Sequence, residues 1–233
     1  MAYCWGYNNN GQLGNGTVTL RLTPTAVAGG RQFRQVSAGG GHTCGVTPSD
    51  VAYCWGSNQS GEAGDGSTFT QRLRPVLVAG GLKFRQVDAG SAFSCGVTTS
   101  YRAFCWGRGS DGQIGDGTTN LRRTPRAVAG GLSVDRVTAG AYHACVETTG
   151  NRAYCWGNNL YGALGDGTRS RRLTPVSVTG GLFFSQVSAG TFYTCARTPE
   201  AKAYCWGSNL EGELGNGTTG NYRLKPTPVA GPM

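Results

Sequence analysis

The sequence contains few charged residues and almost no histidine. Asp, Glu, Lys and Arg make up 14% of its 233 residues, well below the ~25% usual in globular domains, which argues against a charged helical or coiled-coil protein. His42 and His143 are the only histidines and no Cys-x-x-Cys pair occurs, so we expect no zinc site and no other metal or cofactor. No uninterrupted apolar run of about 18 residues occurs either, so we expect no membrane span.

Glycine and aromatic residues are abundant instead. The chain contains 40 Gly, and each Gly inside a helix costs roughly 1 kcal/mol relative to Ala, so a helix-rich fold is excluded. The 5 Trp, 10 Tyr and 8 Phe supply enough aromatic surface to build a core, which argues against disorder. Many glycines and aromatic residues with few charges predict an all-β protein with many turns.

The tryptophans reveal an internal repeat. They stand at positions 5, 55, 106, 156 and 206, in steps of 50, 51, 50 and 50 residues. Four of them lie in the phrase Ala-Tyr-Cys-Trp-Gly, and Phe104 replaces Tyr in the third copy. A period near 50 residues indicates a repeat architecture, which takes precedence over local predictions of secondary structure.

One period can be divided into four short strands. Glycine- and proline-containing turns separate the predicted strands 33–38, 42–47 and 51–55, and a long Gly- and Asn-rich loop leads to a fourth strand at 75–79. Four strands per ~50 residues correspond to one blade of a β-propeller. Because both faces of the third strand are apolar, each blade must be covered by its neighbours.

The blade count predicts an open propeller. Third- and fourth-strand phrases occur five times, but first- and second-strand phrases occur only four times, and the last predicted strand is 226–230. We therefore expect about 4.5 blades in one domain, an open arc or incomplete ring whose ends pack against further segments or copies; a closed five-bladed ring is the alternative. The predicted units are a half blade at 1–31 and blades at 32–81, 82–131, 132–181 and 182–233.

These phrases resemble the regulator-of-chromosome-condensation repeat family. The resemblance is carried by Tyr-Cys-Trp-Gly-x-Asn-x-x-Gly-x-Leu-Gly-x-Gly-Thr at 154–168 and 204–218, by Thr-Pro at 174–175 and by Val-Ser-Ala-Gly at 187–190. It covers nearly the whole chain and implies a propeller, usually of seven blades. It implies several functions, because the family includes guanine-nucleotide exchange factors, modules of ubiquitin ligases and secreted bacterial propellers that inhibit β-lactamase. The last group implies a bacterial origin for this chain.

Nine cysteines occupy two positions of the repeat. In each complete period one Cys on the second strand precedes one on the third strand by ten residues, which places the two directly opposite in a hairpin. We predict four disulfides, with buried free thiols as the alternative, and an extracytoplasmic location that follows from the disulfides. Cys4 has no counterpart ten residues upstream and is predicted to be unpaired. The predicted pairs are Cys44–Cys54, Cys95–Cys105, Cys145–Cys155 and Cys195–Cys205.

The turns between first and second strands are the candidate partner-binding sites. They vary between repeats while the framework around them does not, and they emerge on the same face as the long loops. In the secreted inhibitors that the chain resembles, aromatic residues of the matching turns contact the partner. In the alternative interpretation His42, Phe93, His143 and Tyr193 begin the second strand and pack inward. The predicted binding residues are His42, Phe93, Tyr142, His143, Phe192 and Tyr193 of the turns and Arg122, Arg123, Arg171 and Arg172 of the long loops.

We find no residues for catalysis. No nucleophilic triad can be assembled, and Asp88 and Glu147, which most sister repeats lack, fit hydrogen-bonded edge positions. The net charge of +9 comes mainly from 18 Arg. Acidic residues are mixed with the Arg on the long loops, so nucleic-acid binding is not favoured. The sequence therefore predicts a non-catalytic extracytoplasmic scaffold that binds a protein partner. The alternatives are a lectin that binds a glycan and a guanine-nucleotide exchange factor.

Overall fold

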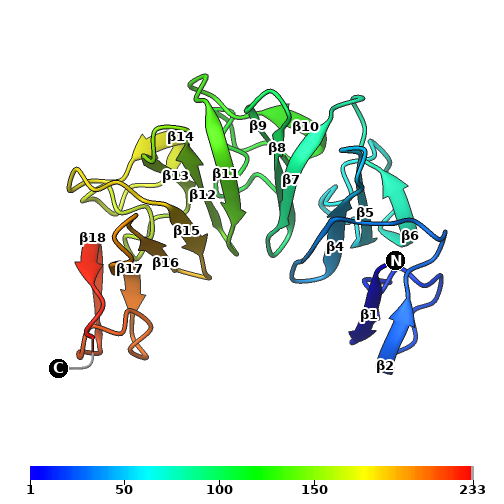
Figure 1. The fold of residues 1–233 in the computed structure, drawn as a ribbon, viewed down its shortest axis with the longest axis horizontal. Coiled ribbons are helices and arrows are strands. Elements are labelled where there is room, and N and C mark those ends of the chain that lie inside the picture. The colour runs from blue at the N-terminus through cyan, green and yellow to red at the C-terminus, as the bar shows by residue number, and fades with distance from the viewer. Residues whose placement is uncertain (232–233) are drawn as a thin grey trace.

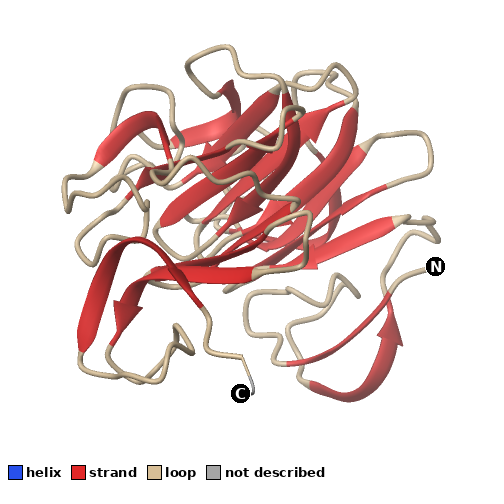
Figure 2. Ribbon diagram, turned by 60° about the vertical axis from the view of Figure 1, so that its left-hand side comes forward, coloured by secondary structure: helices blue, strands red, loops and turns tan. Residues whose placement is uncertain are grey.

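Each period of the sequence forms one antiparallel sheet. We describe residues 1–231 of a computed structural model, which contain eighteen strands in one two-stranded and four four-stranded sheets. In the complete sheets the strands follow one another in chain order, so each sheet is a meander. Figure 2 shows strands joined by loops and turns, and no helix that could span a membrane occurs in the described range.

The bounds of the strands repeat from blade to blade. The half blade contains β1 (Tyr3–Gly6) and β2 (Arg21–Ala26). The first and second complete blades contain β3 (Gln35–Ala38), β4 (His42–Val46), β5 (Ala52–Ser57), β6 (Gln71–Leu77), β7 (Phe84–Ala89), β8 (Phe93–Thr98), β9 (Ala103–Gly107) and β10 (Arg122–Ala127). The third and fourth contain β11 (Val134–Ala139), β12 (His143–Thr148), β13 (Ala153–Gly157), β14 (Arg172–Ser177), β15 (Gln186–Ala189), β16 (Tyr193–Arg197), β17 (Ala203–Asn209) and β18 (Asn221–Pro228).

The blades are arranged in an open arc. Strands β7, β11 and β15 lie on its concave side and the fourth strands of the blades on its convex side, with the two chain ends at opposite tips (Figure 1). Strand β1 pairs only with β2, and β18 pairs only with β17. The described residues therefore form an all-β propeller of about 4.5 blades that does not close, and the closed five-bladed alternative is wrong.

The fourth strands begin earlier than the sequence predicts. Strand β6 starts at Gln71 rather than at residue 75, and β18 starts at Asn221 rather than at residue 226. The reason is a bulge in the pairing of β5 with β6. Cys54 pairs with Val76 and Gly56 pairs with Arg72, so the fourth strand has three residues between these two pairs where the third strand has one. Gly56 has a φ of 103°, a conformation that favours glycine. The long loop is correspondingly shorter than predicted.

The four predicted disulfides are confirmed. Each joins directly opposed residues of the second and third strands, as in the pairing of Cys44 with Cys54, whose Cα atoms are 4.0 Å apart. The other three bonds are Cys95–Cys105, Cys145–Cys155 and Cys195–Cys205. Cys4 is the free cysteine of the described chain, as predicted.

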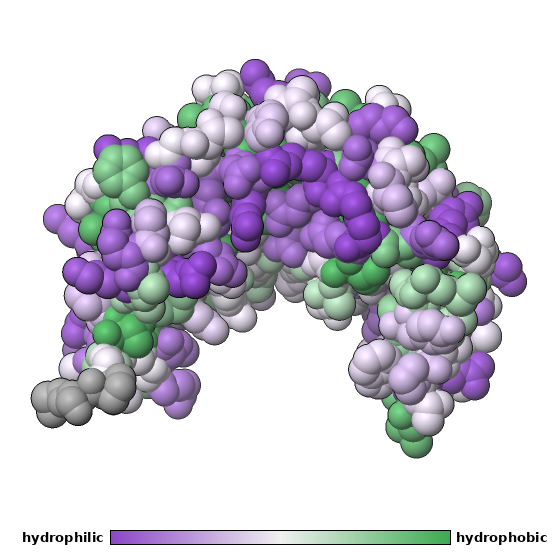
Figure 3. Space-filling model, in the orientation of Figure 1, coloured by the Kyte–Doolittle hydropathy of each residue, from purple (hydrophilic) through white to green (hydrophobic). Residues whose placement is uncertain are grey.

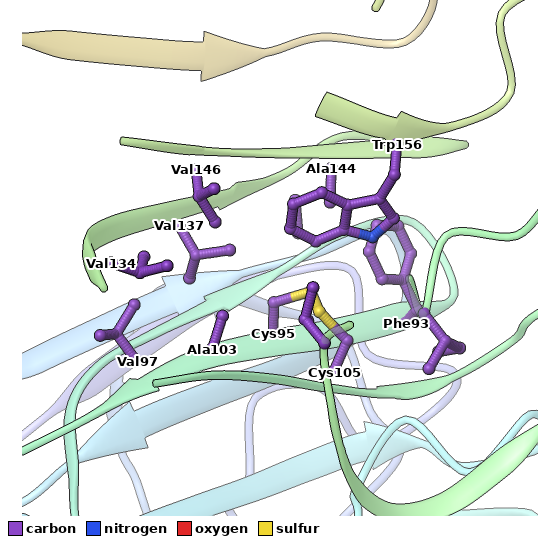
Figure 4. Packing of buried hydrophobic residues seen from close by; sticks show 13 residues of the cluster. Phe93, Cys95, Val97, Ala103, Cys105, Val134, Val137, Ala144, Val146 and Trp156 are labelled. Carbon is purple, nitrogen blue, oxygen red and sulfur yellow. A yellow bond between two sulfur atoms is a disulfide. The ribbon is translucent and has the colours of Figure 1, made fainter. Parts of the chain in front are cut away.

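The core lies between the blades rather than within them. The disulfide of the second complete blade packs against Val137, Ala144 and Trp156 of the third (Figure 4). The indole Nε1–H of Trp156 reaches back to donate to the carbonyl oxygen of Gln113 at 2.9 Å. Gly115 lies against the same indole, and a Cβ there would come within 2.6 Å of the ring. The contact therefore requires glycine, and Trp55, Trp106 and Trp206 make the same contact with Gly14, Gly64 and Gly165.

Side chains of the inner strands join neighbouring blades by hydrogen bonds. The Gln35 amide donates to the Val87 carbonyl oxygen at 2.7 Å and accepts from the Val87 N–H at 3.0 Å. Gln86 makes the same two bonds with Val137. At the next interface Arg136 replaces Gln, and Glu147, which lies opposite Arg136, accepts from the Val187 N–H instead.

Asp88, on the first strand of its blade, links the first strands of three consecutive blades. Its carboxylate accepts from the Ser37 hydroxyl at 2.6 Å and from the Ala139 N–H at 2.8 Å. Burial raises the pKa of Asp88 and that of Glu147. Both acids thus have structural hydrogen-bonding roles.

Removing one disulfide should destabilise the fold without changing its architecture. Cys95→Ala with Cys105→Ala opens a loop of about eleven residues, so the free energy of unfolding should fall by roughly 2–3 kcal/mol. Urea unfolding followed by circular dichroism measures this loss. Cys4→Ala is the control and should change stability little, because Cys4 has no disulfide partner. An equal loss in both variants would contradict the structural role of the disulfide.

Candidate functional site

The turns between first and second strands meet the long loops on one face of the arc. The ring of Tyr161, from the long loop of the third complete blade, lies 5.1 Å from that of Phe192, in the turn of the fourth. The N–H of Asn158, at the start of the same loop, donates to the carbonyl oxygen of Tyr142 in the turn of its own blade at 2.9 Å. We call this side of the molecule the loop face.

Neighbouring turns on the loop face are tied together by backbone hydrogen bonds. Gly40 donates to Gly90, Ser91 to Gly140 and Ala141 to Gly190, at 3.1, 3.2 and 3.1 Å respectively. The residue after each donor therefore has a similar position in each turn. These positions hold Gly41, Ala92 and Tyr142, and Phe192 follows Thr191 at the equivalent position of the fourth turn. Within the described residues, aromatic side chains therefore occupy this position in neighbouring turns only in the third and fourth complete blades.

Three aromatic side chains form a cluster there, which we call the aromatic rim: Tyr142, Tyr161 and Phe192. The rings of Tyr142 and Phe192 are stacked at 5.1 Å with an interplanar angle of 8°, and Tyr161 is tilted against Phe192 by 59°. All three are half-buried, so each is partly held by its neighbours and partly open to solvent. The rim is an ordered apolar surface that needs little rearrangement to make a contact.

An exposed extension continues the rim. Arg169 lies 4.7 Å above the ring of Tyr222 and donates to the Tyr222 hydroxyl at 3.0 Å. Its Nε–H also donates to the carbonyl oxygen of Leu160 at 2.7 Å. Leu160 is 51% exposed and Tyr222 is 38% exposed. One Arg therefore binds the backbone of Leu160 and the side chain of Tyr222, which belong to adjacent blades.

The long loops that carry these residues are internally braced. Asn159 is buried; its Oδ1 accepts from the Leu164 N–H at 3.0 Å and its Nδ2 donates to the Ser170 carbonyl oxygen at 3.1 Å. Asp166 caps the following turn by accepting from Thr168 and also binds Arg172. Burial alone would raise the pKa of Asp166, but these hydrogen bonds hold it below its usual value. The loop thus has one well-defined conformation.

The four predicted arginines have different roles. Arg122 and Arg172 form ion pairs at 2.6 and 2.8 Å with Asp116 and Asp166, whose side chains are 3% and 2% exposed. These two guanidinium groups therefore bind carboxylates of the long loops. Arg123 is half-buried over Gly61 of the preceding blade, and Arg171 is exposed and donates to the Ser110 carbonyl oxygen at 3.1 Å.

The first residues of the second strands lie inside the molecule. His42, Phe93 and His143 are 1%, 0% and 0% exposed, so they cannot contact a partner directly in this conformation. The inward alternative describes them correctly, because their side chains fill the space between consecutive blades. Tyr193 is half-buried over Gly190 and lines a shallow pocket formed by the turns between first and second strands. Of the predicted turn residues, Tyr142, Phe192 and Tyr193 are thus partly accessible, and Tyr142 and Phe192 are the two whose rings stack on each other.

Each of these interior aromatic side chains matches the residue that it faces. The Nε2 atoms of His42 and His143 lie 2.8 Å from the hydroxyl oxygens of Ser94 and Thr194 on the next blade. Those hydroxyls donate to the carbonyl oxygens of Glu62 and Ala163, so they accept the proton of the imidazole Nε2–H. Phe93, which has no donor, packs in one cluster with Ala144, which has no acceptor side chain. The interface therefore pairs polar with polar and apolar with apolar side chains.

Burial keeps both histidines neutral. The Nδ1 atoms of His42 and His143 are buried without a hydrogen-bond partner, so a proton added there would have no acceptor. Burial lowers the pKa of each imidazole to about 4. This protonation state suits a structural position between blades.

Comparison between repeats identifies one of the four site residues that the sequence analysis does not predict. Tyr161, Leu160, Arg169 and Tyr222 were not predicted. The loop position of Tyr161 holds Asn10, Ser60, Asp111 and Glu211 in the other repeats, so Tyr161 is its only aromatic residue. The pairing of Arg169 with Tyr222 spans two blades and has no signal within one repeat.

Comparisons with known sequences identify one family. A family model described as an RCC1-like domain matches residues 1–233. The ultraviolet-B receptor UVR8 of Arabidopsis thaliana is 33% identical over 119 residues, which cover 49% of this chain and 27% of the receptor. The human E3 ubiquitin-protein ligase HERC2 is 43% identical over 54 residues, which cover 22% of this chain and 1% of the ligase. The matched part is thus about a quarter or less of each relative.

Solved structures support the same fold. Human WBSCR16 superposes with a TM-score of 0.86 at 23% identity, covering 99% of this chain and 62% of that one. Prp20p of Saccharomyces cerevisiae, studied for its binding to Gsp1p and histones, gives 0.85 at 20% identity, with 99% and 59% covered. Both likenesses concern the fold alone. The ectodomain of the Physcomitrella patens receptor kinase CR4 gives 0.57 at 27% identity, with 81% and 44% covered.

Lowering the pH should destabilise the fold through the two histidines. An unfolded imidazole binds a proton near pH 6.5, whereas burial lowers the folded pKa to about 4. The stability contribution is therefore complete above pH 6.5 and is lost as the pH falls towards 4, by up to roughly 3 kcal/mol for each histidine. His143→Phe with Thr194→Ala copies the native pair of Phe93 and Ala144 and removes one of these contributions.

Urea unfolding of both proteins at pH 7 and at about pH 4.5 tests this sign. The variant should gain about 2–3 kcal/mol relative to the wild type on going to the lower pH. Burial raises the pKa values of Glu62, Asp88 and Glu147, so through these acids a lower pH stabilises the fold. Both proteins contain the three acids, so their contribution cancels when the two proteins are compared at the same pH. A stability difference that does not change with pH would show that His143 is not held neutral.

Proposed function

This chain belongs to the RCC1-like domain family, and we propose that it is a non-catalytic protein-binding propeller whose contact surface is the aromatic rim with its extension. The single observation that carries the proposal is the accessible, pre-ordered cluster of Tyr142, Tyr161 and Phe192. Tyr and Arg are enriched among residues that dominate protein–protein binding energy. Here they adjoin on braced loops, so little conformational freedom is lost on binding.

The ring geometry favours a protein partner over a glycan. A sugar stacks on an open aromatic face, but Tyr142 and Phe192 cover one face of each other. The accessible remainder combines ring edges with the side chain of Leu160 and the guanidinium group of Arg169. Such a mixed surface suits complementary apolar and acidic side chains of a protein.

The polar groups that could perform catalysis have structural partners. Asp88 and Glu147 accept hydrogen bonds from neighbouring blades, and the two histidines are buried against hydroxyl groups. The ligase activity of HERC2 is not transferred, because the match covers 1% of that protein. Exchange-factor activity would rest on likeness of fold alone and is not proposed.

We place the protein outside the cytosol. Four disulfides form and persist most readily in an oxidising compartment. The similarity to a receptor-kinase ectodomain is consistent with this location. The relatives named above come from plants, human and yeast, so a bacterial origin rests only on the earlier resemblance.

The proposal predicts that partner capture depends on two rim residues. The immobilised chain should retain a specific protein from an extracellular extract of its source, and Tyr142→Ala with Phe192→Ala should reduce retention about ten-fold or more. The matched control is Phe183→Ala, because Phe183 is a 50% exposed aromatic residue at the other end of its blade and carries Arg152 above its ring at 4.0 Å. Quantitative mass spectrometry of the eluates measures retention.

Two outcomes would contradict the proposal. Equal retention by the rim variant and by the wild type would remove the rim from the contact surface. Elution of the retained material by free mono- or oligosaccharide would identify a lectin instead. Thermal unfolding of all three proteins checks that the substitutions leave the fold intact.

A further inference from the structure

Acidic side chains bind arginines on the inner strands and in the long loops. Figure 3 shows hydrophilic residues on the concave side of the arc, where Arg85 of β7 binds Asp135 of β11 at 2.8 Å. In the long loops of the first three complete blades, Arg72, Arg122 and Arg172 bind Asp65, Asp116 and Asp166. The loop of the half blade differs, because Asn15 stands at the position of the Asp and leaves Arg21 without an acid.

In the three complete loops the carboxylate serves two donors. One oxygen of Asp116 accepts from the Thr118 N–H at 3.0 Å, and the other accepts from the Arg122 Nε–H at 2.7 Å. Asp65 and Asp166 bind the equivalent backbone N–H groups and arginines in the same way. This turn therefore uses two acceptor oxygens at one position.

Asn15 has one acceptor oxygen for the same two donors. Its Oδ1 accepts from the Thr17 N–H at 3.0 Å. Its Nδ2, which takes the place of the second carboxylate oxygen, and the Nε of Arg21 are both buried without a hydrogen-bond partner in the described chain. Turning the amide over would give Arg21 an acceptor but would set the NH₂ group against the Thr17 N–H. One donor is unpaired in either orientation, which costs stability.

A second guanidinium group adjoins the same turn. A Cβ on Gly16 would lie 3.1 Å from the Nε of Arg74, which the next strand pair of the arc contributes. At the two following interfaces Thr124 and Thr174 take the place of Arg74. A negative charge at position 15 would thus have two guanidinium groups beside it.

We propose that Asn15 is a deamidation site, and that conversion of its amide to a carboxylate completes this turn. Asn15 is followed by Gly16, and an Asn-Gly pair cyclises readily because glycine has no side chain to hinder the attack. The Gly16 nitrogen bonds to the Asn15 Cγ, the Cγ–Nδ2 bond breaks, and ammonia leaves with the proton of the Gly16 nitrogen. Water then adds to Cγ of the succinimide and the ring Cγ–N bond breaks. The Gly16 nitrogen regains a proton, and the new carboxyl group ionises.

The fold selects between the two products of ring opening. Water can also open the succinimide at the main-chain carbonyl carbon, which gives isoaspartate and adds one carbon to the backbone. Position 15 lies between two fixed points, because the Gly14 carbonyl oxygen accepts from the Ala28 N–H and the Gly16 N–H donates to the Leu73 carbonyl oxygen, both at 2.9 Å. The same two bonds flank Asp116, so aspartate fits between them and a longer backbone does not.

The Asn15→Asp variant, which carries the side chain of the product, tests the fit. Its equilibrium constant for unfolding in urea should be about ten-fold smaller than that of the wild type, because two buried donors gain an acceptor. In an Arg21→Ala background most of this gain should disappear. Asn120→Asp is the control, because it makes the same charge change at an exposed loop residue and should have an effect of about two-fold or less. Equal effects of Asn15→Asp and Asn120→Asp would overturn the proposal.

Timed incubation of the folded protein in mildly alkaline buffer tests the reaction. Peptide mapping by mass spectrometry, with chromatographic separation of the two products, follows position 15. The residue should convert more slowly than in a synthetic peptide of residues 8–24, because the bond from Gly16 to Leu73 must first open. The folded protein should yield mainly aspartate, whereas the peptide should yield mainly isoaspartate.

Two results of the incubation would contradict the proposal. One is an unchanged amide after about ten half-lives of the peptide, since a surface loop should open within that time. The other is isoaspartate as the main product in the folded protein. Neither measurement involves a partner or the residues of the aromatic rim, so the deamidation site and the proposed function can fail separately.

Discussion

The contact of each buried tryptophan with the preceding blade is the interaction on which the rest of the structure depends. The indole lies on a glycine of the preceding long loop and donates its N–H to a carbonyl oxygen of that loop, at 2.8–2.9 Å in all four cases. One side chain thereby supplies core packing, fixes the loop and sets the spacing of blades. Because every interface joins only neighbours, the arc is stabilised step by step, as in other repeat proteins. It also follows that the first tryptophan, Trp5, has no loop beneath it in the described chain.

The candidate site is a consequence of this regular frame. The Trp contact and the bond between Asp166 and Arg172 hold the long loop, while the bond from Ala141 to Gly190 holds adjacent turns at fixed spacing. On such a frame a substitution at one turn position changes the surface while the backbone stays the same. Tyr142 and Phe192 stack because their turns are neighbours, and Tyr161 reaches them because its loop is braced. The repeat thus supplies rigidity, and the variable positions supply the aromatic surface on which the proposed function rests.

The sequence predicts what repeats along the chain and fails where contacts cross between repeats. The period, the disulfides and the open arc follow from spacing, since each depends on identical residues at fixed intervals. Whether His42 or Phe93 points outward depends on Ser94 and Ala144, about 50 residues away, and no local pattern shows that match. Arg122 and Arg172, which the sequence predicts on the long loops, begin strands β10 and β14 and are bound by buried carboxylates. The early start of the fourth strands depends on a glycine bulge that shifts the register, which alternation of residues does not reveal.

The central claim is that each blade is covered by the tryptophan contact and that the first blade is left uncovered. Hydrogen exchange of the five indole N–H groups, followed by nuclear magnetic resonance on ¹⁵N-labelled protein, tests it most directly. Four indole signals should exchange slowly, because Trp55, Trp106, Trp156 and Trp206 are buried and hydrogen-bonded to the preceding blade. The fifth should exchange rapidly and disappear in the Trp5→Phe variant, because Trp5 is 60% exposed. Five protected indoles, or loss of a slowly exchanging signal in that variant, would contradict the open arc described here.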